Sequence, residues 1–370
     1  MKIAIDCRSS FPGRGGIGRY AENLGRRIPL LDQNNNYVIL TTDRQKEKIC
    51  SYEKVQQMQF PTGMIDPLWE QTCLPSILKE HAINLYHNPC FSLPIAKEKL
   101  KLVTTIHDVV FREKPELVEE KLCAYLDRWT QVACKIADAI ITVSEYSKRQ
   151  LIRYYDVSPN KIEVIYNGID AKFKKASPMQ CSIVCQRYRL PEKFLLYLGS
   201  IEPKKNIERL LEAMQIIKEK HRDYPLVIAG GKGSKQYDIE NAIQKLKLKD
   251  SVLLIGYVDE SDVVPLLSQA NIFIYPSLYE GFGFPPLEAM ACGTPTIVSN
   301  ATSLPEIVGS SALVFDAEDS QSLASAIERL LSDNQEYMAL VWKGKSQAEK
   351  FRWEECARRT LDVYSKVMER

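Results

Sequence analysis

Short apolar runs alternate with longer amphipathic stretches along most of the chain. In the first half, these runs predict strands at residues 2–5, 37–42, 102–106, 139–144 and 162–166. A second series follows at residues 194–199, 225–230, 252–256, 272–277, 294–299 and 312–315. Helix-like segments lie between them, such as residues 206–221, where apolar positions recur every three or four residues. Almost wholly apolar strands that alternate with helices predict βαβ units around parallel sheets covered on both faces.

The two series of strands are separated by residues 167–193, which combine a lysine cluster with several glycine, serine and proline positions. This composition predicts a linker with one short helix. We therefore expect an α/β protein with two Rossmann-like, doubly wound domains facing across a cleft, at residues 1–172 and 173–350. The stretch from about Gln347 to Arg370 has a helical pattern with no strand after it. We expect residues 351–370 to pack as an appendage, either on the C-terminal domain or back on the N-terminal one.

The composition excludes several classes of protein. Lys+Arg 49 against Asp+Glu 47 gives a net charge of +2, so no bulk attraction to nucleic acid is expected. The ten cysteines are scattered, and only Cys181 and Cys185 form a close pair, which favours reduced thiols over a zinc site. The N-terminal segment lacks the apolar stretch of a secretory signal, and no window approaches the ~18 apolar residues of a membrane span. These features predict a cytoplasmic protein.

A glycine-rich loop, Gly13-Arg14-Gly15-Gly16-Ile17-Gly18, follows the first predicted strand. With Asp43 after the next strand, it imitates a dinucleotide-binding fingerprint. In that fingerprint the first glycine closes the turn directly after the strand, whereas residues 7–12 intervene here. A glycine loop before a helix N-terminus suits contact with a phosphate or a sugar, because free N–H groups point outward there. A dinucleotide site and a plain mobile loop are the alternatives.

Two further loops follow predicted strands. His107 and Asp108 come directly after the strand at 102–106, where the histidine is either structural or functional and Asp108 could orient its ring or cap the next turn. Lys204 and Lys205 precede a helix for which Asn206 is the expected N-cap. Two lysines oppose the helix dipole unless an anion such as a diphosphate binds there, the alternative being two solvated loop lysines. As an exposed loop residue, Lys205 is expected to contribute less than about 0.5 kcal/mol to stability.

The most specific pattern lies at residues 279–290, YEGFGFPPLEAM, directly after the strand at 272–277. Two glycines let the backbone approach a ligand closely, and the prolines then begin a helix. Glu280 stands in the loop and Glu288 in the helix, eight positions later. The two carboxylates could accept hydrogen bonds from the hydroxyls of a sugar and of a ribose. A role in complementing the helix dipole alone would not require Gly-Phe-Gly.

The Glu-x7-Glu pattern in EGFGFPPLE, together with ACGTPTIVS, resembles the retaining glycosyltransferases of the family 4 type, which have the GT-B fold. The segments GGIGRYAENL, TTIHDVVF, TVSEYSKRQL, VIYNGID, LGSIEPKKN, LIGYV and LPEIVG follow in the order and spacing of that family. The resemblance therefore covers nearly the whole chain. Within the family, the chain looks most like bacterial mannosyltransferases that use GDP-mannose for cell-surface polysaccharide.

This resemblance implies that the C-terminal domain binds a nucleotide sugar and that the N-terminal domain mainly receives the acceptor. It assigns Glu288 to the ribose, Glu280 to the sugar hydroxyls and to positive charge on the ring, Lys205 to the diphosphate and His107 to the sugar. Further donor contacts are implied at Gly16, Ser200, Lys204, Tyr257, Val258, Leu287 and the backbone N–H groups of Phe282, Gly283 and Phe284. Many members have an arginine where this chain has Ser200, so neutralisation of the diphosphate would depend more on Lys205, with Lys204.

The resemblance also implies catalysis without a divalent metal or cofactor, in agreement with the absence of an Asp-x-Asp motif. We expect a hexose, most simply mannose from GDP-mannose, to pass to a saccharide or lipid-linked saccharide acceptor. Weak peripheral contact with the inner face of the cytoplasmic membrane is expected, with Leu68 and Trp69 contributing. The alternatives are a UDP-sugar-dependent glucosyl- or N-acetylglucosaminyltransferase, a nucleotide-sugar epimerase or hydrolase, an NAD-dependent enzyme, and a non-catalytic partner subunit on the same fold.

Overall fold

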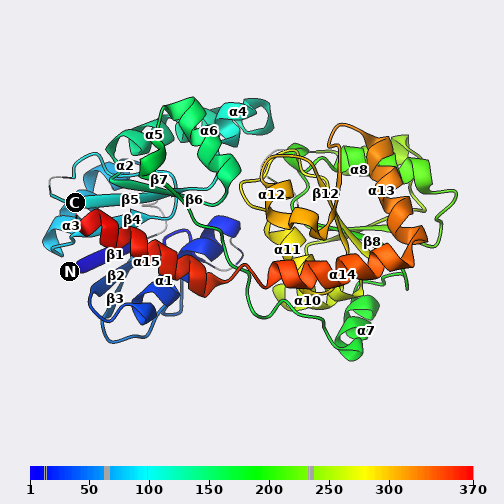
Figure 1. Ribbon diagram of the computed structural model, residues 1–370, viewed down its shortest axis with the longest axis horizontal. Helices are drawn as coiled ribbons and strands as arrows, with labels where there is room; N and C mark the ends of the chain where they lie inside the picture. The colour runs from blue at the N-terminus through cyan, green and yellow to red at the C-terminus, as the bar shows by residue number, and fades with distance from the viewer. Residues whose placement is uncertain are drawn as a thin grey trace. The chain divides into compact units, whose positions relative to one another are not determined.

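The computed structural model describes residues 1–11, 13, 15–61, 67–97, 99–231, 233 and 237–369 of the chain. The chain folds into two compact units. The first comprises Met1–Pro115, Glu120–Gly168 and Arg352–Arg370, and the second comprises Glu116–Glu119 and Ile169–Phe351. Figure 1 shows that each unit is built on its own sheet, with helices on both faces.

The first unit contains, within its described residues, a seven-stranded sheet of order β3-β2-β1-β4-β5-β6-β7 in which all neighbouring strands run parallel. The strand order reverses between β1 and β4, which is the switch point of a doubly wound sheet. Its elements are β1 (Lys2–Asp6), α1 (Gly16–Leu31), β2 (Asn36–Thr42), β3 (Val55–Phe60), α2 (Pro67–Thr72), α3 (Leu74–Glu80), β4 (Leu85–Asn88), β5 (Lys101–Ile106), α4 (Val110–Glu113), α5 (Glu120–Ile136), β6 (Ala139–Thr142), α6 (Glu145–Tyr155), β7 (Ile162–Val164) and α15 (Trp353–Glu369).

Two strands of this sheet were not predicted from the sequence. β3 has the sequence VQQMQF and lies at the edge of the sheet, where most of its side chains are only half-buried, so it has no apolar run. β4 is central and buried but has only four residues, LYHN, two of them polar. Its His87 is fully buried and bonded to Tyr364 and Thr105, which lets a polar residue occupy the core.

The second unit contains a parallel six-stranded sheet, in its described part, of order β10-β9-β8-β11-β12-β13. All six of its predicted strands are present. Its elements are α7 (Pro178–Arg187), β8 (Leu195–Leu198), η4 (Pro203–Lys205), α8 (Ile207–Ile217), β9 (Leu226–Ala229), α9 (Ile239–Lys245), β10 (Val252–Gly256), α10 (Glu260–Gln269), β11 (Ile272–Tyr275), α11 (Phe284–Ala291), β12 (Thr296–Ser299), α12 (Leu304–Val308), β13 (Leu313–Phe315), α13 (Ser320–Ser332) and α14 (Asn334–Ala348). The prediction of two doubly wound parallel-sheet domains is confirmed.

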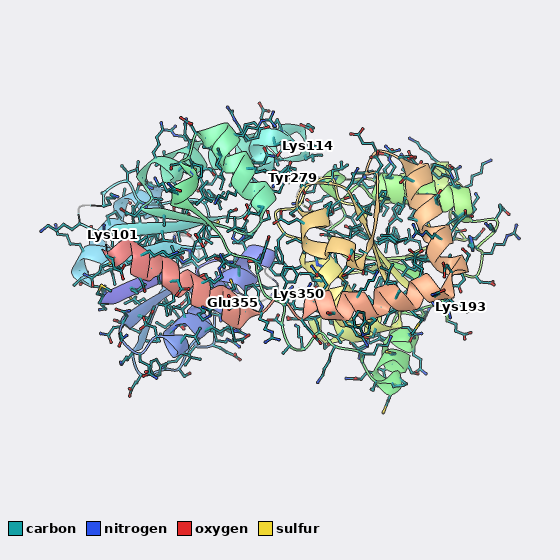
Figure 2. All side chains as sticks on the ribbon, viewed as in Figure 1. Lys101, Lys114, Lys193, Tyr279, Lys350 and Glu355 are labelled. Carbon is teal, nitrogen blue, oxygen red and sulfur yellow. The ribbon has the colours of Figure 1, made fainter. Side chains whose placement is uncertain are left out.

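The C-terminal segment forms two helices, not the single helix expected from about Gln347 onward. α14 ends at Ala348 in the second unit, and α15 begins at Trp353 in the first unit. α15 packs along α1, as the adjacent red and blue helices of Figure 1 show. Trp353 and Tyr364 on α15 are both fully buried, so this helix completes the core of the first unit. Figure 2 marks Glu355 on the same helix.

All ten cysteines are free thiols, and six of them are buried. This agrees with the prediction of reduced, mostly buried cysteines. Among the described residues, no helix combines the length and apolar character that crossing a membrane requires.

Candidate functional site

Several of the predicted donor residues lie at the switch point of the second sheet. There the strand order reverses between β8 and β11, and ligands of such sheets bind at the carboxyl ends of the strands beside this reversal. The loop after β8 carries Lys204 and Lys205, and the loop after β11 carries Glu280. The two loops are joined because the Leu278 N–H donates to the Lys204 carbonyl at 2.8 Å. Figure 2 marks Tyr279, the neighbour of Glu280 in the second loop.

Lys205 and Glu280 form a buried ion pair at this switch point. The Lys205 Nζ lies 2.6 Å from Glu280 Oε1 and 2.9 Å from the Tyr275 hydroxyl. Burial is the largest single influence and opposes the charge on both groups, but their mutual attraction and hydrogen bond, together with weaker contributions from neighbouring polar groups, outweigh it. The pKa of Lys205 is therefore raised above its ordinary value, and the pKa of Glu280 is lowered below its own. Both groups are charged at neutral pH.

The surroundings of Lys205 and Asn206 correct two expectations from the sequence. Lys205 is only 8% exposed, so it is not an exposed loop lysine and its removal cannot be nearly neutral for stability. Asn206 does stand before α8, but its backbone is left-handed, with φ 57°, and its side chain makes no capping hydrogen bond. The Asn206 side chain instead donates to the Pro276 and Ala317 carbonyls, which fixes the turn that carries Lys205 against the loop after β11.

Glu202 is a site residue that the sequence analysis missed. Its Oε1 accepts a hydrogen bond from the Ser200 hydroxyl at 2.7 Å and lies 3.6 Å from the Lys204 ammonium. Glu202 is 7% exposed, so it is a buried carboxylate among groups expected to face a diphosphate. Part of the positive charge of Lys204 is thus neutralised by Glu202, as that of Lys205 is by Glu280. The pattern of a glutamate two residues after Ser200 is visible in the sequence but has no distinctive spacing.

The loop of Glu280 is held by two further residues that the sequence did not single out. The Thr302 hydroxyl accepts from the Glu280 N–H at 3.0 Å and donates to the Glu280 carbonyl at 2.9 Å. The Ser303 hydroxyl donates to the same carbonyl at 2.8 Å. Both lie after β12, so the backbone of Glu280 is fixed by a neighbouring strand end. These hydrogen bonds hold the backbone from which the Glu280 carboxylate reaches Lys205.

Helix α11 places the second glutamate of the pattern. Gly283 stands at its N-cap with φ +104°, a conformation that favours glycine, and an added Cβ would come within 2.7 Å of Leu304. The backbone N–H groups of Phe282 and Gly283 have no hydrogen-bond acceptor among the described residues. Glu288, on the second turn, is 4% exposed, and Leu287 beside it is fully buried. The predicted contact of Leu287 with the donor stays a prediction.

Tyr257 and Val258 follow β10 and differ in exposure. The Tyr257 side chain is 69% exposed, so its ring face is open for a stacked base, whereas Val258 is 5% exposed. A tyrosine ring on a solvent-exposed loop offers a planar apolar surface with a polar tip. Tyr257 is thus the member of this pair that could stack on a base.

The remaining predicted site residues, Gly16 and His107, belong to the first unit. Gly16 is the first residue of α1 and is exposed. Of the glycine-rich loop before it, Arg14 lies outside the described residues, as does Pro12. The half-buried His107 directly follows β5, and Asp108 caps the next turn by accepting from the Val110 N–H.

The geometry of His107 fixes which ring nitrogen carries a proton, and its burial favours the neutral ring. Its Nε2 lies 2.9 Å from the Pro89 carbonyl, which can only accept, so Nε2 carries the proton. Burial lowers the pKa of the His107 imidazole, even though Pro89 and Asp108 act in the opposite direction. The ring is therefore neutral at physiological pH and presents Nδ1 as a hydrogen-bond acceptor. The Tyr20 ring packs edge-on against it, with centroids 4.9 Å apart.

A buried charge cluster at the carboxyl end of β1 was not anticipated. Arg8 is 3% exposed and binds Asp6 at 2.6 Å and Glu70 at 3.0 Å. Its guanidinium also stacks on the Trp69 ring, 4.1 Å from the centroid. Trp69 is 4% exposed, so the expectation that it contacts a membrane is wrong, whereas Leu68 beside it is 68% exposed. The cluster ties the segment after β1 to α2.

Within the described residues, no group of three or more histidine, cysteine or acidic side chains is arranged to hold a metal ion. This finding concerns the side chains of the described part of the protein. The predicted independence of a metal stays a prediction.

Two protein-family descriptions match this chain. Residues 14–173 match the family described as Glycosyltransferase Family 4, and residues 186–347 match the one described as Glycosyl transferases group 1. The O-antigen chain mannosyltransferase B of Escherichia coli is 34% identical over 289 residues, which cover 78% of this chain and 75% of that protein. The serotype-specific mannosyltransferase WbdA of Escherichia coli is 30% identical over 75% of this chain, which corresponds to 35% of its own length.

Among solved structures, the sucrose-phosphate synthase of Thermosynechococcus elongatus has a TM-score of 0.78 at 21% identity, over 100% of this chain and 99% of that one. The fold is thus the GT-B fold of glycosyltransferases. The chain belongs to the glycosyltransferases whose N-terminal half matches Glycosyltransferase Family 4 and whose C-terminal half matches Glycosyl transferases group 1. The predictions of family, fold and enzyme class are confirmed. The roles of individual residues stay predictions.

Proposed function

We propose that this glycosyltransferase moves mannose from GDP-mannose, with retention of configuration, onto a saccharide acceptor of a cell-surface polysaccharide. The observation that carries the proposal is the Lys205–Glu280 pair at the β8/β11 switch point. It puts a cation suited to a diphosphate beside a carboxylate suited to sugar hydroxyls. The choice of mannose is supported by similarity to the O-antigen chain mannosyltransferase B.

In this proposal, each chemical group of the nucleotide sugar has a partner in the second unit. The Tyr257 ring would stack on the base, and Glu288 would accept hydrogen bonds from the ribose hydroxyls. Lys205 would bind the diphosphate, with the Phe282 and Gly283 N–H groups contributing further hydrogen bonds. As the bond to the leaving diphosphate breaks, negative charge grows on it. A cation placed in advance stabilises that charge without reorganisation of solvent.

Glu280 and His107 would act on the sugar itself. Glu280 would bind sugar hydroxyls and stabilise positive charge on the ring as the donor bond breaks. His107 would accept a hydroxyl hydrogen bond at Nδ1, because its Nε2–H is engaged by Pro89. The acceptor hydroxyl would then attack from the face that the nucleotide leaves, and its proton would pass to the oxygen of the departing diphosphate. This attack keeps the configuration at the reacting carbon without a protein nucleophile.

The donor is tested by the melting temperature of the protein with GDP-mannose, UDP-glucose, UDP-N-acetylglucosamine and ADP-glucose. A ligand that binds only the folded state stabilises it by about 2.7 kcal/mol at a hundredfold excess over its Kd. We expect GDP-mannose to raise the melting temperature, and Glu288→Gln to weaken this response. Stabilisation by a UDP-sugar and not by GDP-mannose would refute the donor and leave the family intact.

The acceptor is proposed to be lipid-linked, with weak contact between the protein and an anionic membrane surface. The support is the net basic charge of residues 1–172 and the exposed Leu68, since Trp69 is buried. Sedimentation with anionic vesicles at low salt, compared with neutral vesicles, tests this part. Equal recovery in both pellets, together with efficient transfer to a soluble saccharide, would remove the membrane from the proposal.

A further inference from the structure

The Lys205 ammonium has two partners of different kinds. An ammonium carries three N–H donors, and here one meets the charged Glu280 Oε1 and another the neutral Tyr275 hydroxyl. In the described part of the chain, the third donor has no hydrogen-bond acceptor. One N–H of the ammonium is therefore available for a phosphate oxygen, while the other two hold the side chain in place.

Tyr275 is a rigid anchor for this lysine. It is the last residue of β11, is 2% exposed, and its ring stacks nearly parallel to two others. The Tyr197 ring lies 6.4 Å away at 14° and the Phe273 ring 6.0 Å away at 19°. A phenol held by a strand and an aromatic stack has far less freedom than the four-carbon stem of a lysine. Its hydroxyl thus marks one fixed position for the Lys205 Nζ.

Tyr275 differs from Glu280 in charge. Burial, the nearby negative charge of Glu280 and a hydrogen bond to its carboxylate raise the pKa of the Tyr275 phenol, so it stays protonated. A neutral oxygen accepts from the ammonium without competing for it against a diphosphate. Glu280 is charged, and in the proposed function it turns to the hydroxyls of the donor sugar. The Tyr275 hydroxyl would then be the anchor that Lys205 keeps.

We propose that Tyr275 is a positioning residue, whose hydroxyl holds the Lys205 ammonium in place for the donor diphosphate. This inference rests on the proposed function, because it needs Lys205 to bind a diphosphate. The opposing interpretation is that Tyr275 is only a core residue whose hydroxyl happens to be satisfied by Lys205. The two differ in whether loss of the hydroxyl weakens recognition of the second phosphate.

The test is the ratio of GDP to GMP affinity, measured by titration calorimetry on the wild type and on Tyr275→Phe. GMP lacks the second phosphate, so changes in base stacking or ribose binding cancel in the ratio. Tyr275→Phe keeps the ring and its stack and removes only the hydroxyl. We expect the ratio to fall about tenfold, which corresponds to about 1.4 kcal/mol. Phe273→Leu, which disturbs the same stack without touching Lys205, should lower the melting temperature and keep the ratio.

A second measurement asks whether Tyr275 acts through Lys205. In a Lys205→Met background, adding Tyr275→Phe should lower the ratio no further, because the two substitutions remove one interaction. An unchanged ratio in Tyr275→Phe, or a further fall in the Lys205→Met background, would overturn the proposal. If Lys205→Met does not fold, the single-variant ratio decides. A wild type that binds GDP no better than GMP would instead refute the proposed diphosphate site, on which this inference rests.

Discussion

Lys205 and Glu280, which are 75 residues apart in the sequence, are joined by a 2.6 Å ion pair whose side chains are only 10% and 14% exposed. Both residues were predicted to contact the donor, one at the diphosphate and one at the sugar. In the protein without a donor, each neutralises the other. The donor must therefore take over interactions that already exist, instead of entering a site with unpaired charges.

The pair makes Lys205 important for stability as well as for activity. Lys205→Ala leaves a buried carboxylate without its cation, and breaking such a pair costs about 3–5 kcal/mol. We expect a loss of about 3 kcal/mol in the free energy of unfolding, measured with urea, and a turnover reduced by about 10²–10³. Lys204→Ala is the matched stability control, because its ammonium is 3.6 Å from Glu202 on a side chain that is 33% exposed. It should cost less than about 1 kcal/mol.

A double substitution separates the two effects of this pair. Lys205→Met with Glu280→Gln removes both charges and should recover much of the stability lost in Lys205→Ala, without recovering turnover. If Lys205→Ala were as stable as the wild type, the ion pair would not form in solution. The lysine would then be a solvated loop residue after all.

His87 predicts a distinct dependence of stability on pH. It is fully buried in β4 between Tyr364 and Thr105, and burial lowers the pKa of its imidazole to about 3 from an ordinary 6.5. As the pH falls below 6.5, the unfolded chain binds a proton at His87 that the folded chain excludes until about pH 3. Stability is therefore lost progressively across this interval. Replacing His87 by Asn should flatten the curve there, as chemical denaturation at several pH values would measure.

The dependence of stability on pH in the wild type and in His87→Asn could also contradict this account. Equal slopes for the wild type and His87→Asn between pH 6.5 and 3 would mean that the imidazole takes up its proton in the folded protein. The buried network with Tyr364, and with it the seating of α15 in the first unit, would then be wrong.

The sequence predicted the fold well where strands are apolar and less well where they are polar. All six strands of the second sheet were visible as apolar runs, whereas β3 and β4 in the first sheet were not. β4 is hidden because His87 fits the core through hydrogen bonds with Thr105 and with Tyr364, which is 277 residues away. A pattern within a short window cannot contain such a partner.

In the candidate site, too, local patterns are predictable from the sequence and contacts between distant residues are not. Spacing and glycines indicate the loops of Lys205 and Glu280 and the helix that carries Glu288, because loops after parallel strands carry their own signal. The contacts between the loops were not predictable. The sequence predicts an exposed Lys205 because the partner of this lysine lies after another strand. It does not single out Glu202, because a single glutamate in a loop has no distinctive pattern. Arg8 was missed for the same reason.

Gly230 is predicted to be irreplaceable, unlike its neighbour Gly231. Gly230 follows β9 with φ +142°, and an added Cβ would lie 1.8 Å from the Gly199 carbonyl, whereas nothing lies within 4 Å of one at Gly231. Gly230→Ala must therefore separate the ends of β8 and β9, and we expect at least about 3 kcal/mol of destabilisation. Gly231→Ala should stay within about 1 kcal/mol. Equal melting temperatures for the two variants would contradict this close approach of the strands.

Activity is predicted to be independent of divalent metal, since Lys205 and backbone N–H groups are proposed to stabilise the leaving diphosphate. Exhaustive treatment with EDTA should leave the rate of transfer within about twofold of the untreated enzyme. Added Mg²⁺ or Mn²⁺ should not raise it. A rate that collapses on chelation and returns with Mg²⁺ would show that a metal supplies the charge assigned to Lys205.

The central claim is best tested by following transfer from GDP-α-mannose to a panel of saccharides that carry a hydrophobic aglycone. Products are identified by mass, and the anomeric configuration of the new linkage is read from its one-bond carbon–hydrogen coupling by NMR. We predict release of GDP and a single added mannose in α-linkage, with both lost in Glu280→Gln. A β-linked product would contradict retention, and consumption of a UDP-sugar with GDP-mannose left intact would contradict the donor.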